Sequence, residues 1–240
     1  MDAKGIDVSS HQGSKLDWSA IAKENDFVIL RTSYGRWIDA QLDNNYLGAT
    51  SAGLLVGGYH FLTPRHTIES QVNMLGSIIE RFDFKLPIFI DIETDPYATA
   101  QASPEFVKNF LEEVLKFDVE LGIYTSSWMW LSIMRNVTDP FYKQFDLWVA
   151  DWRSGVSQPI IPKPWTTYRF WQTSSTGSVP NYSGNIDTDL FNGSREDLYG
   201  YAGNTLTSIL IKEIRDLAVD TRTSADLLVE KLDYLAELLS

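Results

Sequence analysis

The 240-residue sequence contains no cysteine, no long apolar run and comparatively few basic residues. The lack of cysteine excludes disulfide scaffolds, zinc-thiolate sites and cysteine nucleophiles. No stretch approaches the roughly 20 consecutive apolar residues that a membrane-spanning helix needs. The first residues, MDAKGIDVSSHQG, also lack the apolar core of a signal peptide. We therefore expect a soluble chain with no membrane partner, and export by another route stays open.

Charge and aromatic content indicate the class of ligand. The chain has 20 Lys and Arg against 32 Asp and Glu, a net charge of −12. Binding to a nucleic-acid backbone needs concentrated cationic side chains, so nucleic acid is not an expected partner. The 8 Trp, 11 Tyr and 12 Phe are more than a core of this size needs. Because sugar rings stack on aromatic planes, the composition favours a carbohydrate ligand.

Short apolar segments alternate with helical patterns along the first part of the chain. Eight segments read as strands: 5–8, 27–32, 54–62, 86–92, 121–125, 147–150, 168–172 and 186–191. Four read as helices: 18–25, 44–52, 67–82 and 104–117. This alternation predicts a parallel sheet, and strands that are apolar almost throughout favour a closed barrel. The connections 151–167 and 174–184 are rich in Pro, Gly and Ser. The predicted fold class is therefore α/β, an irregular TIM-like (β/α) barrel with a C-terminal helical extension.

The last part of the sequence has a different residue pattern from the barrel. We place a catalytic barrel at residues 1–200 and a helical tail at 201–240, because 206–239 reads as helix. Three roles stay open for this tail: a helix docked on the barrel, a spacer, and a self-associating segment that forms a homo-oligomer. A heptad frame with a polar middle can be laid through Leu210, Ile214, Leu217, Thr221, Ser224, Leu228, Lys231, Leu235 and Leu238.

The segment LPIFIDIE, residues 86–93, is the most informative for chemistry. Residues two apart in a strand point to the same side, so Asp91 and Glu93 project together with Cα atoms about 6.5–7 Å apart. The C-terminal strand ends of a (β/α) barrel form its active mouth, and paired carboxyls there suit glycoside hydrolysis. Alternatively, both acids cap the next helix or pair with Arg31 or Arg36.

Further acids lie on the first and last predicted strands. Asp7 belongs to GIDVSSHQG, and Asp187 and Asp189 belong to NIDTDLF. The first and eighth strands of a closed barrel are neighbours, so these acids can converge on the mouth opposite the fourth strand. Repulsion among them is expected to raise the pKa of at least one acid into the range of a general acid. Asp187 and Asp189 share one side by alternation, so spacing does not decide which of them faces the site.

Seven segments, in order, resemble the glycoside hydrolase family 25 lysozymes, the N-acetylmuramidases of bacteria, fungi and phage endolysins. They lie between residue 4 and about residue 195, and they read GIDVSSHQG, AGLLVGGYHF, LPIFIDIE, LGIYTS, LWVADW, RFWQTS and NIDTDLF. The resemblance implies that Glu93 is the general acid and that Asp91 supports the 2-acetamido group of the substrate. Asp7 and Asp187 would complete the acidic set.

The same resemblance implies a substrate site lined by Tyr59, Tyr124, Trp152 and Gln172. Asp189 stands where the family often has Asn, which adds a fifth carboxyl near the mouth. The alternative is that the aromatic residues belong to the barrel core. Tyr59 and Phe61 alternate with His60 on one strand, so only one of these sets faces the lumen.

Other site chemistries receive little support. His11, His60 and His66 have no H-x-x-x-H or H-E-x-x-H spacing, so each is expected to be structural and no metal is expected. Gly57 and Gly58 lie on a strand and do not form a nucleotide loop. Ser9, Ser10 and His11 are adjacent in sequence, which is not the geometry of a catalytic triad.

The predicted function is hydrolysis of the bond between N-acetylmuramic acid and N-acetylglucosamine in bacterial peptidoglycan, with no cofactor. The second carboxyl could act as nucleophile, as base for water, or as helper to an attacking N-acetyl oxygen, and we favour the third. A phage or prophage endolysin, in the host cytoplasm until release to the wall, is the expected setting; a secreted enzyme is the alternative. Two alternative functions stay open: a chitinase-type hydrolase and a non-catalytic barrel that binds the cell wall.

Overall fold

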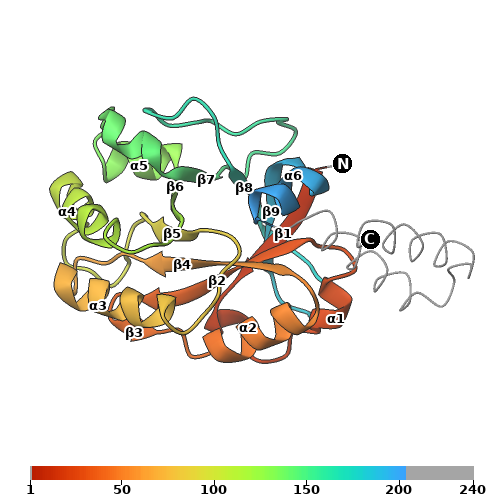
Figure 1. Cartoon of the computed structure of the whole chain (residues 1–240). Coiled ribbons are helices and arrows are strands. Elements are labelled where there is room, and N and C mark those ends of the chain that lie inside the picture. The colour runs from red at the N-terminus through yellow and green to blue at the C-terminus, as the bar shows by residue number, and fades with distance from the viewer. Residues whose placement is uncertain (1, 204–240) are drawn as a thin grey trace, which may run out of the picture. The chain divides into compact units, whose positions relative to one another are not determined.

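Eight strands close into a barrel in the computed structural model, which describes residues 2–203 (Figure 1). The strands follow one another around the ring in the order β1, β9, β8, β7, β6, β5, β4, β2, and β1 pairs with β2 to close it. The predicted irregular TIM-like barrel is confirmed. The strands are β1 (Asp2–Val8), β2 (Phe27–Tyr34), β4 (Leu55–Phe61), β5 (Ile88–Asp91), β6 (Leu121–Ser126), β7 (Asp146–Ala150), β8 (Phe170–Gly177) and β9 (Ile186–Ser194).

The described residues divide into two units, 2–192 with the barrel and 193–203 with helix α6 (Arg195–Tyr201). Ser194 caps α6 by accepting from the Asp197 backbone N–H, and the Asp197 side chain accepts from the Ser194 N–H. The helical tail predicted over 206–239 lies outside the described residues. Among residues 2–203, no helix has the length and apolar character needed to cross a membrane.

Aromatic rings fill the barrel below its mouth. Phe170 contacts Phe27, Phe89 and Phe191 with ring centroids 5.2–5.5 Å apart. Trp148 lies above this group, 5.3 Å from Phe89, and is 1% exposed. The lumen is therefore a packed core and not a channel, so polar chemistry is confined to the mouth.

Helices cover the outside of the barrel (Figure 1). They are α1 (Trp18–Ile21), α2 (Leu42–Ser51), α3 (Ile68–Ile79), α4 (Pro104–Val114) and α5 (Ser127–Ser132), with short 3₁₀ turns η1 (Ser10–Gln12) and η2 (Pro140–Gln144). Thr67, Ser103 and Ser126 cap α3, α4 and α5 through their hydroxyl oxygens. The four predicted helices are present. The helices α1, α3 and α4 are shorter than predicted, whereas α2 begins two residues earlier and ends one residue earlier than predicted. The helices α5 and α6 were not predicted.

The last strand departs from the predicted parallel sheet. All neighbouring pairs from β1 through β2, β4, β5, β6 and β7 to β8 are parallel, whereas β9 pairs antiparallel with β8. A second unpredicted feature is β3 (Trp37–Ile38), which folds back antiparallel on the end of β2. Because β9 runs in the opposite direction, its first residues lie at the end of the barrel where β1 and β5 finish. Asp187 therefore reaches the mouth from the beginning of its strand.

Candidate active site

Three carboxyl groups face one cleft at the mouth of the barrel. Asp7 near the end of β1, Glu93 just after β5 and Asp187 at the start of β9 line a cavity of about 600 Å³. Tyr59 and Phe61 of β4 also line it. Two parallel strands and one antiparallel strand thus bring acids distant in sequence to a single space, as glycoside hydrolysis by paired carboxyls requires.

Glu93 has the pKa that a general acid needs. Burial, followed by the negative charge of Asp187, raises the pKa of Glu93 from its ordinary 4.5 to about 7. A carboxyl with this pKa keeps its proton through the weakly acidic range and can donate it to a leaving oxygen. The arrangement can therefore perform acid catalysis near neutral pH.

Asp91 lies beneath the cleft. It is 3% exposed and lies behind the three acids that line the cavity, so its predicted place in the acidic set stays a prediction. Burial and the charge of Glu93 raise the pKa of Asp91 well above its ordinary value, and the positive charge of Arg31 opposes them. Oδ1 of Asp91 has no hydrogen-bond partner among the described residues. Asp91 thus holds a buried acceptor atom next to Glu93 that no described donor uses.

A glutamine clamp fixes the position of Asp7. Nε2 of Gln172 donates to Oδ2 of Asp7 at 2.6 Å. Oε1 of Gln172 accepts from the Tyr124 hydroxyl at 2.9 Å and from Nε1 of Trp152 at 3.0 Å. Tyr124 and Trp152 thus orient Gln172, and Gln172 holds Asp7. These three residues were predicted to line the substrate site but are not among those that line this cavity. Trp152 is 56% exposed, so its ring remains accessible to a sugar.

The structure separates the two acids of β9, which the sequence left open. Asp187 is half-buried and lines the cleft, whereas Asp189 is 1% exposed and accepts from Nε1 of Trp148 at 2.8 Å. The pKa of Asp189 is raised to about 8: burial is the largest cause, the Trp148 hydrogen bond opposes it, and the charge of Asp187 adds to it. Burial and then the charges of Asp189 and Asp187 raise the pKa of Asp7, which lies within hydrogen-bonding reach of Asp189. These buried carboxyls therefore hold at least one proton among them near neutral pH.

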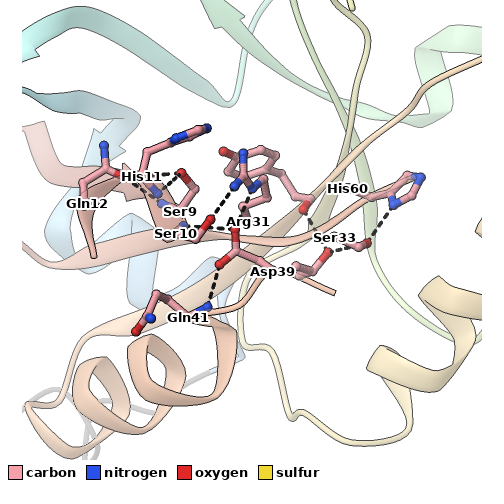
Figure 2. A network of polar contacts seen from close by, with 11 residues as sticks. Ser9, Ser10, His11, Gln12, Arg31, Ser33, Asp39, Gln41 and His60 are labelled. Carbon is pink, nitrogen blue, oxygen red and sulfur yellow. Dashed lines mark hydrogen bonds and ion pairs between the residues drawn. The ribbon is translucent and has the colours of Figure 1, made fainter. Parts of the chain in front are cut away.

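The strand β4 places Tyr59 and His60 on opposite sides. Tyr59 faces the cleft, whereas His60 is fully buried and stacks on Phe110 of α4 with centroids 5.3 Å apart. Nδ1 of His60 lies 2.8 Å from the Ser33 hydroxyl (Figure 2), and burial lowers its pKa to about 4. His60 is thus a neutral core residue.

Arg31 is held at the cleft wall by an ion pair. Its Nε donates to Oδ2 of Asp39 at 2.6 Å and its terminal nitrogen donates to the Ser10 hydroxyl at 2.7 Å (Figure 2). Asp39 also accepts from the backbone N–H of Ser10 and of Gln41. Arg31 pairs with Asp39 and not with Asp91 or Glu93, the alternative that the sequence had left open.

Sequence reasoning missed several residues of the cleft wall. They come from the end of β2 and from the segments that follow β1, β4 and β5, and are Ser9, His11, Gln12, Tyr34, Arg65, Thr94, Pro96 and Tyr97. The signal that would have found them is their position just after C-terminal strand ends, where barrel sites are built. Within residues 2–203, no three His, Asp or Glu side chains are grouped so that they could hold a metal ion.

Comparison with known proteins agrees with this geometry. Residues 6–182 match the model of the family described as glycosyl hydrolases family 25. Lysozyme M1 of Streptomyces globisporus is 31% identical over 215 residues, covering 84% of this chain and 72% of that protein. The N,O-diacetylmuramidase of Arthroderma benhamiae is 28% identical over 213 residues, covering 83% of this chain and 86% of that protein.

A solved structure is similar over nearly its whole length. The bacterial lysozyme from Streptomyces coelicolor superposes with a TM-score of 0.73 at 28% identity, covering 84% of this chain and 97% of that chain. The family match over most of the sequence, the shared barrel and the acid-lined mouth lead to one conclusion. This chain belongs to glycosyl hydrolase family 25 and is a glycoside hydrolase.

Proposed function

We propose that this enzyme is a lysozyme that hydrolyses the β-1,4 bond between N-acetylmuramic acid and N-acetylglucosamine in bacterial peptidoglycan. The observation that carries the proposal is the meeting of Asp7, Glu93 and Asp187 in one cleft, with the pKa of Glu93 raised to about 7. The names of the relatives, a lysozyme and a muramidase, support the same substrate class.

Glu93 is the proposed proton donor. As the bond from the anomeric carbon to the glycosidic oxygen breaks, the proton of Glu93 passes to that oxygen, and the leaving sugar departs as an alcohol. Water then supplies the hydroxyl group that adds to the anomeric carbon, and its proton returns to Glu93. Asp7 and Asp187 stabilise the positive charge that develops on the sugar ring.

Asp91 is the proposed partner of the substrate 2-acetamido group. Its unpaired Oδ1 beside Glu93 suits an acceptor for the acetamido N–H, which would turn the acetamido oxygen towards the anomeric carbon. Attack by that oxygen and a second displacement by water give retention at the anomeric carbon. NMR of the first product released tests this assignment, and an inverted anomer would contradict it.

Digestion of purified peptidoglycan tests the proposed activity. The wild-type enzyme is expected to release new reducing ends that terminate in muramic acid, and Glu93→Gln is expected to lower the rate by at least roughly a hundredfold because the proton donor is lost. Glu24→Gln removes an exposed carboxylate outside the cleft and is the matched control. Binding to the wall without release of reducing ends would support the non-catalytic reading, and reducing ends on glucosamine would support a different glycosidase.

The setting of the enzyme stays a prediction from the sequence. If it is a phage or prophage endolysin, cytoplasmic expression in a susceptible bacterium is expected to cause lysis only when a holin-type pore is co-expressed. Lysis without the pore would favour the secreted alternative.

A further inference from the structure

The cleft has a second end with the opposite charge. Besides the three acids, the cavity is lined by Arg65 after β4, by Tyr34 at the end of β2, and by Tyr97 in the segment after β5. The Arg65 guanidinium lies 5.8 Å from the ring centroid of Tyr97 and 5.9 Å from that of Trp37, and its NH1 is 3.4 Å from the Tyr34 hydroxyl. We call the lining residues Tyr34, Arg65 and Tyr97, together with Trp37 beside Arg65, the basic end of the cleft.

The guanidinium at this end has no carboxylate partner. Arg31, Arg81, Arg153 and Arg169 each form an ion pair within the described part of the chain, whereas Arg65 forms none there. Arg36, whose guanidinium lies 5.7 Å from the Trp37 centroid, also forms none among residues 2–203. His66 packs edge-on against Trp37 at 4.4 Å, and burial followed by the charges of Arg36 and Arg65 lowers its pKa. Asp95 acts on Arg65 through its charge but does not form an ion pair with it, so no carboxylate of the described residues contacts this guanidinium.

A buried network holds the basic end in place before any ligand arrives. The Thr63 hydroxyl accepts from the Arg65 backbone N–H at 3.1 Å and donates to Oδ2 of Asp95. Oδ1 of Asp95 accepts from the Tyr97 backbone N–H at 2.8 Å. Asp95, which is 1% exposed, is occupied by these donors and forms no ion pair with Arg65 within the part of the chain described. The segments that carry Arg65 and Tyr97 are thus fixed relative to each other.

We propose that Arg65, flanked by Tyr34 and Tyr97, binds a carboxylate of the peptide attached to muramic acid in the substrate. This inference rests on the proposed muramidase function. A guanidinium presents several N–H donors to a carboxylate. The rings of Trp37 and Tyr97 near the guanidinium and the Tyr34 hydroxyl limit its movement, and the rings suit the adjoining apolar peptide atoms. The acidic end of the cleft repels such a group, so the two ends together fix the direction in which a peptide-bearing glycan lies.

The test compares Arg65→Gln with wild type on two soluble substrates, glycan chains that carry their peptides and the same chains after an amidase has removed the peptides. On peptide-bearing chains we expect about a tenfold fall in kcat/KM, mainly through KM, the scale of one lost charge-assisted hydrogen bond at a solvated site. Amidase hydrolysis leaves the short lactyl carboxylate on muramic acid in place of the peptide, and on these chains we expect no change from wild type because the peptide carboxylates are gone. Arg65→Lys should recover part of the loss because it keeps the charge. Arg81→Gln is the control, since Arg81 is exposed and lies outside the cleft.

The outcomes separate this inference from the proposed function. An equal loss of kcat/KM on both substrates would mean that Arg65 stabilises the fold or contacts the sugar chain itself. That result would overturn the inference. Walls stripped of phosphate polymers supply a second comparison: if the effect of Arg65→Gln disappears there, the anion is a phosphate and the assignment to peptide carboxylate is wrong. Failure of the wild-type enzyme to cleave either glycan would instead contradict the muramidase proposal itself.

Discussion

Asp187 is the charged group that, after burial, raises the pKa of Glu93. Asp187→Asn removes this negative charge with little change in shape, so the pKa of Glu93 is expected to fall. The alkaline limb of the kcat/KM profile, which reports loss of the Glu93 proton above about pH 7, should therefore move to lower pH by roughly one unit. The pH at half-maximal kcat/KM is the quantity to measure.

Asp83→Asn is the control for Asp187→Asn. Asp83 is exposed and pairs only with Lys85 among the ion pairs of the described residues, so its loss changes the net charge equally without approaching Glu93. An alkaline limb that stays in place in Asp187→Asn, or moves to higher pH, would contradict the role assigned to Asp187.

Asp189 couples the stability of the barrel to pH. Its pKa is about 8 in the folded protein and 3.8 ordinarily, so the folded state retains a proton that the unfolded chain releases. Stability from this group is therefore complete below about pH 4 and is lost as pH rises towards 8. Asp189→Asn keeps an acceptor for Nε1 of Trp148 without an ionisable group. We expect it to raise the free energy of unfolding at pH 8 by roughly 1–3 kcal/mol, with no gain near pH 4.

Urea denaturation at the two pH values measures this effect. Asp189→Leu provides the contrast, because it removes both the charge and the acceptor and should destabilise the protein at acidic pH as well. If Asp189→Asn is no more stable than wild type at pH 8, ionisation of Asp189 at that pH does not lower the free energy of unfolding, which contradicts this prediction.

At the scale of elements, the turn between β2 and β3 supports the basic end of the cleft. Gly35 has φ of 54°, and a Cβ there would lie 2.1 Å from Nδ1 of His66 and 2.7 Å from the Thr63 methyl carbon. Gly35→Ala therefore combines a left-handed backbone with a collision, and we expect a loss of about 2–4 kcal/mol in unfolding free energy. Because Thr63 and His66 flank Arg65, the KM for peptide-bearing glycan should also rise.

Gly53→Ala is the control that introduces backbone strain without a steric collision of the added Cβ. Gly53 has φ of 83°, and nothing lies within 4 Å of its added Cβ, so this variant should lose only about 1 kcal/mol and keep the wild-type KM. Thermal or chemical unfolding of both variants provides the comparison. Equal losses in the two proteins would mean that the contact of Gly35 with His66 is unimportant.

The sequence predicted elements best where local pattern and burial agree. Eight strands were predicted from apolar runs, and each corresponds to a barrel strand with shifts at its ends. The two-residue strand β3 has too few residues to show a period, and the direction of β9 depends on pairing with β8, which no local pattern encodes. Alternation likewise placed Asp187 and Asp189 on one side but did not predict that Trp148 binds Asp189 below the mouth.

The residues of the site likewise divide into those that local sequence pattern predicts and those that it does not. Asp7, Glu93 and Asp187 follow recognisable strands, so their meeting at the mouth could be predicted once closure of the barrel was assumed. Arg65 and Tyr97 lie in irregular segments, positioned by the contact between Thr63 and Asp95, which are 32 residues apart in sequence. Long-range contacts of this kind leave no periodic signal, and the basic end of the cleft was missed for that reason.

At the scale of the whole molecule, net charge opposes the proposed activity. The chain carries −12 and a bacterial wall is anionic, so long-range electrostatics repel enzyme from substrate and cannot supply affinity. Several weak contacts made together would supply it without a favourable net charge. We propose that the segment 206–239, which lies outside the described residues, provides this avidity by joining copies of the enzyme. The apolar positions of its heptad frame, such as Leu210, Leu217 and Leu235, are the basis for the proposal.

Truncation after Gly203 tests this last proposal. Light scattering should give an oligomer for the full chain and a monomer for the truncated one. Both forms should cleave short soluble glycan equally, because the carboxyls of the cleft belong to residues 7–187. On intact walls the truncated form should be slower by about tenfold or more, since each copy then binds alone. A monomeric full-length chain would exclude oligomerisation, and equal rates on intact walls would show that one catalytic barrel finds its substrate without the tail.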